Sequence, residues 1–225
     1  AVLGGARGTN EDAFMWARLA DAVGSSMRDA QLDDGLPASI LGYPQATIDS
    51  TCSSKTVILI APDVKEELPV LYVRLRDAVT KHGLKVIEIA SHHTGFSKYA
   101  WRSVMCEPGA QADAVRTTLA DAAVAAQVAS GAVTVIAGRA NLAEAASFTM
   151  AAVDAVMTSV PTARVLPALR RGNVRGALSV GLAPAEGKDA AAILEAAAAG
   201  KVECLVLLGA DPLNDVADAD LARRA

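Results

Sequence analysis

Two apolar runs decide the fold, Thr56-Val57-Ile58-Leu59-Ile60-Ala61 and Lys85-Val86-Ile87-Glu88-Ile89-Ala90. Runs of this length, rich in β-branched residues, are typical of strands buried on both faces of a parallel sheet. Between them, apolar residues recur at spacings of three and four, which predicts an amphipathic helix from Pro69 to a stop at Gly83. The stretch therefore predicts a strand, a helix and a parallel strand, with the loop 61–67 at the carboxyl edge where open α/β sheets bind ligands.

The same two patterns continue on both sides of this stretch. The expected strands lie at 1–3, 99–105, 133–137 and 202–208, and the expected helices follow Thr9 or span 111–130, 142–157 and 190–199. Residues 57–63 and 205–212 are also alike, since each is an apolar strand that leads into a short acidic loop containing proline. We therefore expect an α/β fold of mainly parallel sheets flanked by helices, in two related Rossmann-like halves, 1–130 and 131–225.

Composition excludes several classes of function. The chain has 225 residues, of which 52% are hydrophobic, so it has ample material for a core. Its net charge of −4 and the lack of a Lys/Arg cluster argue against binding nucleic acid. No run of apolar residues is long enough to span a membrane and no leader precedes the first strand, which predicts a cytoplasmic location.

Potential metal ligands are scattered along the sequence. The cysteines stand at 52, 106 and 204, too far apart for a CxxC-type cluster, and we expect buried free thiols. His92 and His93 follow a predicted strand, but neighbouring histidines seldom share a metal without a further ligand. Asp33 and Asp34 are adjacent, and adjacent side chains point apart on any regular element. We therefore expect no metal site in this chain.

A glycine-containing loop, Gly4-Gly5-Ala6-Arg7-Gly8, joins the first strand to a helix that begins with a capping box of Thr9 and Asp12. Along this helix Trp16, Leu19, Ala20 and Val23 form the predicted apolar stripe. A glycine loop before a helix can bind phosphate through its N–H groups, but the spacing is not GxGxxG. A tight turn is the favoured interpretation, and nucleotide binding is the alternative.

Four segments carry a resemblance to a known family. The first two are residues 8–12, Gly-Thr-Asn-Glu-Asp, and residues 63–71, Asp-Val-Lys-Glu-Glu-Leu-Pro-Val-Leu. The other two are residues 171–177, Arg-Gly-Asn-Val-Arg-Gly-Ala, and residues 208–215, Leu-Gly-Ala-Asp-Pro-Leu-Asn-Asp. They resemble the molybdopterin oxidoreductase superfamily. Within it the chain is most similar to the large iron–sulfur subunit of bacterial NADH-quinone oxidoreductase, respiratory complex I. The similarity runs nearly end to end and implies the molybdopterin oxidoreductase type of two-halved fold.

The resemblance also bears on cofactors. Catalytic members of the superfamily hold a pterin dinucleotide between the two halves, and a Cys, selenocysteine, Ser or Asp binds molybdenum or tungsten. That ligand falls near residues 33–35, where no Cys or Ser stands, and the Asp-Pro-Arg segment that helps hold the guanine is replaced by residues 90–92. The resemblance therefore implies a vestigial pocket with no catalytic residue and no cofactor. Its remaining candidates are Gly5, Asn10, Asp34 and Asp63.

The resemblance further implies a non-catalytic scaffold module of the peripheral arm of a proton-translocating enzyme, in which electrons pass from NADH through iron–sulfur clusters to quinone. The 2Fe-2S and 4Fe-4S clusters are expected in a part of the subunit that this sequence lacks. The chain opens inside a strand without Met and stops within a helical pattern, so we expect a fragment.

The expected partners are other peripheral-arm subunits, including the NADH-binding subunit, on the cytoplasmic side of the bacterial inner membrane. Contact with the membrane is expected only through the complex. Two alternatives stay open. One is an active molybdopterin-dependent oxidoreductase, such as a formate dehydrogenase, with Asp34 as metal ligand, and the other is a nucleotide-binding α/β domain.

Overall fold

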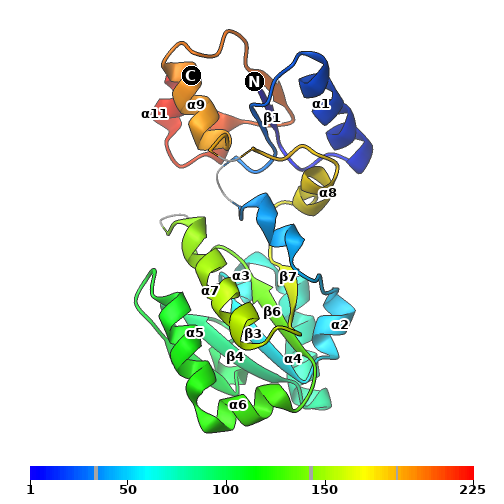
Figure 1. Ribbon diagram of the computed structural model, residues 1–225, viewed down its shortest axis with the longest axis vertical. Coiled ribbons are helices and arrows are strands. Elements are labelled where there is room, and N and C mark those ends of the chain that lie inside the picture. Colours follow the sequence, from blue (N-terminus) through cyan, green and yellow to red (C-terminus); the bar gives the residue numbers. More distant parts are fainter. Residues whose placement is uncertain (33–34, 142–143, 186) are drawn as a thin grey trace. The chain divides into compact units, whose positions relative to one another are not determined.

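The structure is a computed structural model that describes residues 1–32, 35–141, 144–185 and 187–225. The chain forms two compact units, unit 1 from residues 1–38 and 169–225 and unit 2 from residues 39–168 (Figure 1). This division differs from the predicted boundary between residues 130 and 131. Strand β6 (Val133–Ala137) pairs with β3 (Thr56–Ile60) inside unit 2, whereas β8 (Val206–Leu208) pairs with β1 (Val2–Gly4) in unit 1.

Unit 2 is built on a parallel sheet with the strand order β5-β4-β3-β6-β7, where β4 is Lys85–Ala90, β5 Arg102–Met105 and β7 Arg164–Pro167. The central strand β3 is buried along its whole length, as its apolar run predicted. Its register places Val57 opposite Val86 on β4 and opposite Thr134 on β6. The predicted strand–helix–strand unit of parallel strands is thus confirmed.

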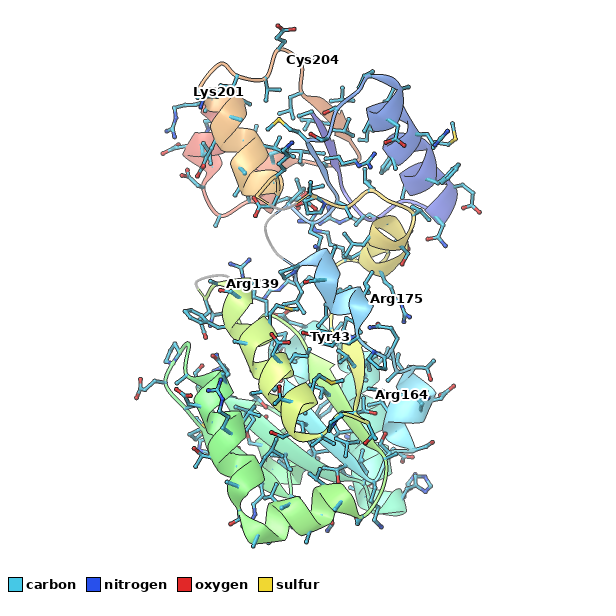
Figure 2. The ribbon with its side chains drawn as sticks, viewed as in Figure 1. Tyr43, Arg139, Arg164, Arg175, Lys201 and Cys204 are labelled. Atoms are coloured by element: carbon cyan, nitrogen blue, oxygen red, sulfur yellow. The ribbon has the colours of Figure 1, made fainter. Side chains whose placement is uncertain are left out.

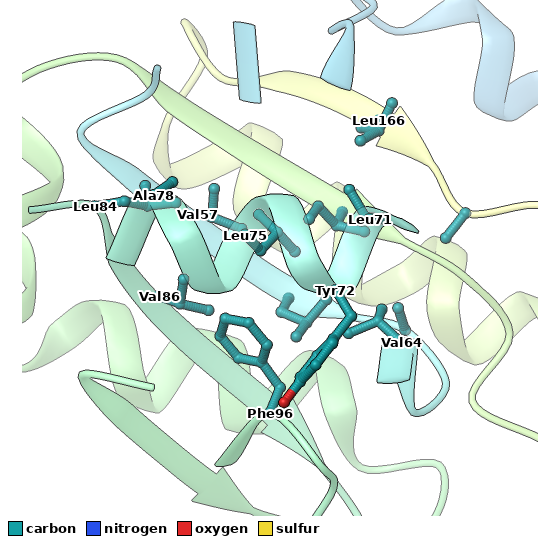
Figure 3. Close-up of a cluster of buried hydrophobic side chains, with 14 of the residues drawn as sticks. Val57, Val64, Leu71, Tyr72, Leu75, Ala78, Leu84, Val86, Phe96 and Leu166 are labelled. Atoms are coloured by element: carbon teal, nitrogen blue, oxygen red, sulfur yellow. The ribbon is translucent and has the colours of Figure 1, made fainter. Parts of the chain in front are cut away.

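Helices cover this sheet on its two faces (Figure 1). The helices of unit 2 are α2 (Ile48–Cys52), α3 (Val64–Glu67), α4 (Pro69–His82), α5 (Gln111–Ala120), α6 (Ala122–Ala129) and α7 (Ala146–Ser159). Two 3-10 helices are also present, η1 (Ala38–Gly42), which begins at the boundary with unit 1, and η2 (Ser97–Tyr99). Helix α4 begins with Pro69 and ends at Gly83, whose φ of 72° is left-handed. Figure 3 shows Leu71, Leu75 and Ala78 of α4 in a cluster with side chains of the sheet. Phe96, from the loop after β4, belongs to the same cluster and is fully buried.

Two predicted helices of unit 2 have different bounds in the structure. The single helix expected over 111–130 is two helices, because Asp121 adopts an extended conformation between α5 and α6. Its Oδ1 accepts hydrogen bonds from the backbone N–H groups of Ala123 and Val124 and so caps α6. The predicted helix over 142–157 corresponds to α7, and its expected start at Leu142 lies outside the described residues.

Unit 1 is built on a parallel sheet with the order β2-β1-β8, where β2 is Arg28–Asp29. Its helices are α1 (Asn10–Ala22), α8 (Val174–Ser179), α9 (Ala190–Ala198), α10 (Pro212–Asp215) and α11 (Ala219–Arg224). The strand predicted over 202–208 is shorter in the structure, where only β8 forms a strand. Leu3 on the central strand and Ile193 on α9 are fully buried and belong to one core cluster.

The buried face of α1 matches the predicted apolar stripe only in part. Ala20 of that stripe is buried together with Ala13 and Ala17, whereas Leu19 and Val23 are 41% and 65% exposed. Small alanine side chains let a helix lie close to a sheet, so packing places the alanine face inward although the larger apolar residues lie beside it. Apolar spacing therefore identified the helix and the burial of Ala20, and it was wrong for Leu19 and Val23.

Candidate functional site

The candidate site is the carboxyl edge of the sheet in unit 1. The chain continues from the central strand β1 to β2 on one side, and it later returns to form β8 on the other side. In open α/β sheets this reversal of strand order marks the edge where ligands bind. The loop after β1, which contains Gly5 and Arg7, and the loop after β8, which contains Gly209 and Asp211, meet there.

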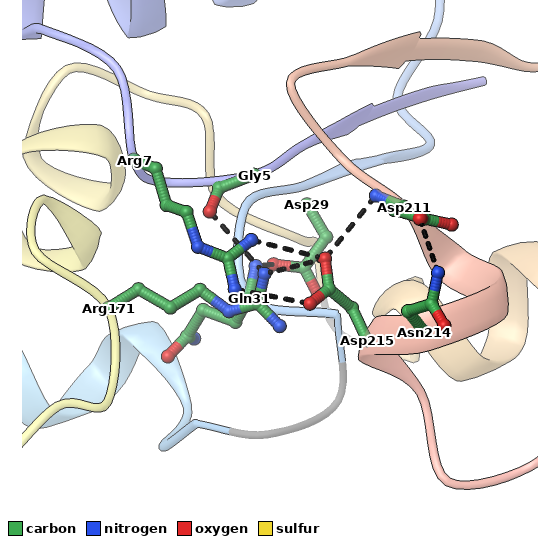
Figure 4. A network of polar contacts seen from close by, with 8 residues as sticks. All are labelled: Gly5, Arg7, Asp29, Gln31, Arg171, Asp211, Asn214 and Asp215. Atoms are coloured by element: carbon green, nitrogen blue, oxygen red, sulfur yellow. Dashed lines mark hydrogen bonds and ion pairs between the residues drawn. The ribbon is translucent and has the colours of Figure 1, made fainter.

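An ion-pair network occupies this edge (Figure 4). Both terminal nitrogens of Arg7 donate to the carboxylate of Asp215 at 3.2 Å, and Arg171 donates to the same carboxylate at 3.2 Å. The Arg171 side chain is only 3% exposed and that of Asp215 13%, whereas that of Arg7 is 59% exposed. Hydrogen bonding from Arg7 holds the pKa of Asp215 below its usual range, so this carboxylate stays ionised at neutral pH.

Gly5 brings the two loops into backbone contact. Its N–H donates to the carbonyl of Leu208 at 3.1 Å. A Cβ atom at Gly5 would lie 1.6 Å from the carbonyl oxygen of Gly209, so no side chain fits there. Arg171 also donates to the Gly5 carbonyl at 3.4 Å. The predicted candidate Gly5 thus serves close packing of loop against loop.

Asn10 is exposed at the first position of α1, beside the predicted capping box. That box is present, since Thr9 Oγ1 accepts from the N–H of Asp12 at 3.2 Å and Asp12 accepts from the N–H of Thr9 at 2.9 Å. Together with Glu11, the Asp12 carboxylate puts negative charge on the first helical turn. Like charge at this helix end disfavours a phosphate, which argues against nucleotide binding through the glycine loop.

Two buried polar residues also lie at this edge, Asp29 at the end of β2 and Gln31 in the loop that follows it. Asp29 accepts hydrogen bonds from the N–H groups of Ala30, Gln31 and Ala190, the last at the start of α9. The amide nitrogen of Gln31 donates to the Leu36 carbonyl at 2.6 Å, and its Oε1 lacks a partner in the described part of the chain. This oxygen would lie 1.8 Å from a Cβ at Gly35. The loop is therefore held by its own polar groups.

We expect unit 1 to lose stability as the pH rises from about 4 to about 6, because burial raises the pKa of Asp29 to about 6 from 3.8. An acid whose pKa is higher in the folded state favours folding while it is protonated, and ionisation at higher pH removes that advantage. The free energy of unfolding should fall by roughly 2 to 3 kcal/mol through this group. Carboxyl NMR titration of Asp29 measures the pKa directly.

The control is Asp29→Asn, which does not titrate. The difference in unfolding free energy between wild type and variant should change across this pH window, whatever the absolute stability of the variant. Taking the difference cancels Asp215, whose lowered pKa acts in the opposite sense, with stability lost as the pH falls. A difference that is flat from pH 4 to 7 would contradict the prediction.

The other predicted candidates lie elsewhere. Asp63 is in unit 2, where one carboxylate oxygen accepts from the N–H of Lys65 at 2.9 Å and the other from the N–H of Gly95 at 2.8 Å. It ties the loop after β3 to the loop after β4. Asp34 lies outside the described residues. Gly5 and Asp63 are thus each engaged by the backbone of their own unit.

Sequence reasoning missed Arg171 and Asp215 as site residues. Both stand in segments that carry the family resemblance, but 44 positions separate them and nothing in the sequence pairs them. The available signal was an arginine in a glycine-rich segment and an aspartate after a proline-containing turn. Charged residues in such loops are usually solvated, so this signal was weak.

Metal ligands do not gather in the described ranges. No group of three His, Cys, Asp or Glu side chains there is close enough to hold a metal ion. Cys52 and Cys106 are half-buried, and burial raises the pKa of both thiols, whereas Cys204 is exposed before β8 (Figure 2). None of the described helices combines the length and the apolar character needed to cross a membrane.

Known proteins resemble this chain along its whole length, although no protein-family model matches it. It is 27% identical over 286 aligned residues to a subunit of NADH-quinone oxidoreductase from Streptomyces coelicolor, covering 100% of this chain and 33% of that protein. It is also 30% identical over 258 aligned residues to the subunits of the same name from Mycobacterium bovis and Mycobacterium tuberculosis, covering 97% of this chain and 31% of those proteins. The chain is therefore a homologue, over its whole length, of about a third of this NADH-quinone oxidoreductase subunit.

Proposed function

We propose that this chain is a non-catalytic scaffold module of the peripheral arm of NADH-quinone oxidoreductase. The observation that carries the proposal is the similarity to one subunit of that enzyme along the entire chain. In this role the chain supports electron transfer from NADH to quinone by holding cluster-bearing parts and neighbouring subunits in place. The 2Fe-2S and 4Fe-4S clusters lie in other parts of the subunit, and the arm faces the cytoplasm as part of a proton-translocating enzyme.

The geometry of unit 1 supports a scaffold rather than a catalyst. At the edge where an α/β sheet would bind a cofactor, Asp215 joins Arg7 to Arg171. The backbone of Gly5 lies against Gly209 in the same place. Because the one Asp215 carboxylate binds both guanidinium groups, the network holds the loops that carry these side chains in position. Loops held in this way suit a surface that holds other subunits.

Metal and pterin analysis of the purified complex tests the proposal. We expect the chain to copurify with NADH-quinone oxidoreductase in equal amount, with far less than one molybdenum or tungsten atom per chain and no released pterin. Because a scaffold needs no such cofactor, activity should also be unaffected when molybdate and tungstate are left out of the growth medium. Stoichiometric metal with bound pterin would refute the non-catalytic role.

One variant and one binding experiment test the two alternative functions. An active molybdopterin enzyme with Asp34 as metal ligand would lose metal and activity in Asp34→Ala, since a direct ligand cannot be removed without consequence. The scaffold proposal expects both to be unchanged. A nucleotide-binding domain would release heat in calorimetry with GTP, NADH or FAD at millimolar concentration. The scaffold proposal expects no heat from any of the three.

A further inference from the structure

Unit 2 has a pocket of about 470 Å³ beside the segment that follows β4. It is lined by Lys65, His93, Thr94, Gly95, Ser97, Lys98 and Ser103. Lys65 and Lys98 supply the cationic groups of this lining. The Lys65 ammonium lies 3.4 Å from Glu66 on the protein surface, and that of Lys98 lies 5.2 Å from the centre of the Tyr99 ring. The two lysines therefore give the pocket positive charge, which Glu66 offsets in part at Lys65.

A buried carboxylate fixes the floor of this pocket. Glu88 on β4 is 1% exposed and accepts hydrogen bonds from the hydroxyls of Thr94 and Ser103, the second at 2.8 Å. Those two hydroxyl protons point at Glu88 and are not available to a ligand. Ser97 differs, because its oxygen accepts from the N–H of Thr94 at 2.9 Å and its own proton is left to donate.

The groups left to act on a ligand are mainly hydrogen-bond donors. They are the ammonium groups of Lys65 and Lys98, the Ser97 hydroxyl and a ring N–H of His93. Donors with positive charge select acceptors with negative charge, and a carboxylate accepts from several such donors at once. These donors of the pocket lining are thus complementary to a carboxylate.

The pocket adjoins an open strand edge. Strand β5 is the last strand of the sheet on this side, and Ser103 belongs both to β5 and to the pocket wall. Met105 on the same strand is 43% exposed, and Arg102 is exposed beside the ring of Trp101. A small ligand is usually almost enclosed by its site, whereas a polypeptide can lie along a strand edge and place one side chain in a pocket.

We propose that this pocket receives a carboxylate side chain from an acidic segment of a neighbouring subunit that lies along the edge of β5. The inference rests on the proposed function, since it names the kind of partner that the scaffold holds. Positive charge at the pocket steers the acidic segment and fixes its register, and the exposed apolar surface of Met105 adds contact area.

Carbodiimide cross-linking of the purified complex tests this contact, because the reagent joins a lysine amine to a carboxylate only when the two groups touch. We expect Lys65 or Lys98 to be linked to an Asp or Glu of another subunit when the digested complex is examined by mass spectrometry. Lys85 is the internal control, since it is an exposed lysine at the opposite, amino end of β4. Links from Lys65 and Lys98 to carboxylates of this chain alone, such as Glu66, would overturn the proposal.

Charge reversal gives a second readout. The double variant Lys65→Glu with Lys98→Glu should reduce the fraction of complex that retains the chain about tenfold. The double variant Lys65→Gln with Lys98→Gln should retain an intermediate fraction, and the control Lys85→Glu should retain the same fraction as wild type. Circular dichroism of each variant checks that it folds. Retention equal to wild type in a folded double variant would contradict the docking.

A free anion is the competing occupant of the pocket. NMR titration of the isolated chain with inorganic phosphate should leave Gly95 and Ser97 unmoved at micromolar concentration. Shifts of those amides would assign the pocket to a free anion and overturn the proposal.

If the chain is absent from the purified complex, the proposed function fails. If the chain is present but its pocket lysines are not linked to another subunit, the docking alone is refuted.

Discussion

Replacing Gly5 with alanine is expected to lower the free energy of unfolding of unit 1 by about 4 kcal/mol, more than the usual effect of overpacking. The added Cβ would lie 1.6 Å from the Gly209 carbonyl oxygen, far inside contact distance. The clashing atom is backbone that follows β8, so relief requires β1 and β8 to separate. Urea unfolding in a Trp101→Phe background measures the effect, because the Trp16 ring lies near Gly4 and Gly209 and reports on unit 1.

Gly172→Ala is the matched control. It is the same substitution in the same unit, but a Cβ there meets nothing within 4 Å and the residue does not have a positive φ. Its unfolding free energy should stay within about 0.5 kcal/mol of wild type. If Gly5→Ala unfolded at the same urea concentration as Gly172→Ala, the close contact between the two loops would be refuted.

Replacing Phe96 with alanine is expected to destabilise unit 2 by about 3 to 5 kcal/mol. The ring is fully buried and lies 6.1 Å from the Tyr72 ring and 5.9 Å from the Tyr99 ring, measured between centroids. Removing it leaves a cavity that these neighbours fill only in part. Phe96 also anchors the loop that carries Thr94 and Ser97, so the pocket beside β5 should loosen as well.

Phe148→Ala is the control, because this ring is 42% exposed on α7 of the same unit. Its loss should cost about 1 kcal/mol. Hydrogen exchange of the β3 and β4 amides compares the two variants, since exchange from the core of the sheet reports on unfolding of the whole unit. Equal protection in the two variants would contradict a core position for Phe96.

Local patterns were sufficient for most helices and strands. The run from Thr56 to Ala61 predicted β3, and the proline and glycine around α4 predicted both of its ends. The break at Asp121 was missed because the alanine-rich sequence on both sides favours helix, and only the capping hydrogen bonds show that a second helix begins. The exposed side of α1 was missed because close packing at Ala13 and Ala17 outweighs side-chain size.

Long-range pairings could not be predicted from the sequence. The pairing of β1 with β8 joins residues about 200 positions apart, and no local pattern indicates it. The same holds for Arg171 with Asp215, which form the core of the candidate site. Gly5 and Asp63 were singled out as pocket candidates, but the contacts that they make depend on the Gly209 carbonyl and the Gly95 N–H, which only the fold brings to them.

The insertion of unit 2 within unit 1 links the folding of the two units through chain entropy. The bridge between Gln45 and Val165 holds the entry and exit of unit 2 together, with the Ala46 N–H donating to the Val165 carbonyl at 2.8 Å. When unit 2 is folded, the two ends of residues 39–168 are held close together. This segment then no longer adds its full length to the loop that must close when β1 pairs with β8. This shortens the loop between β1 and β8 from about 200 to about 80 residues, which favours closure by on the order of 1 kcal/mol. Damage to the core of unit 2 should thus weaken unit 1 even where no side chain of unit 1 has changed.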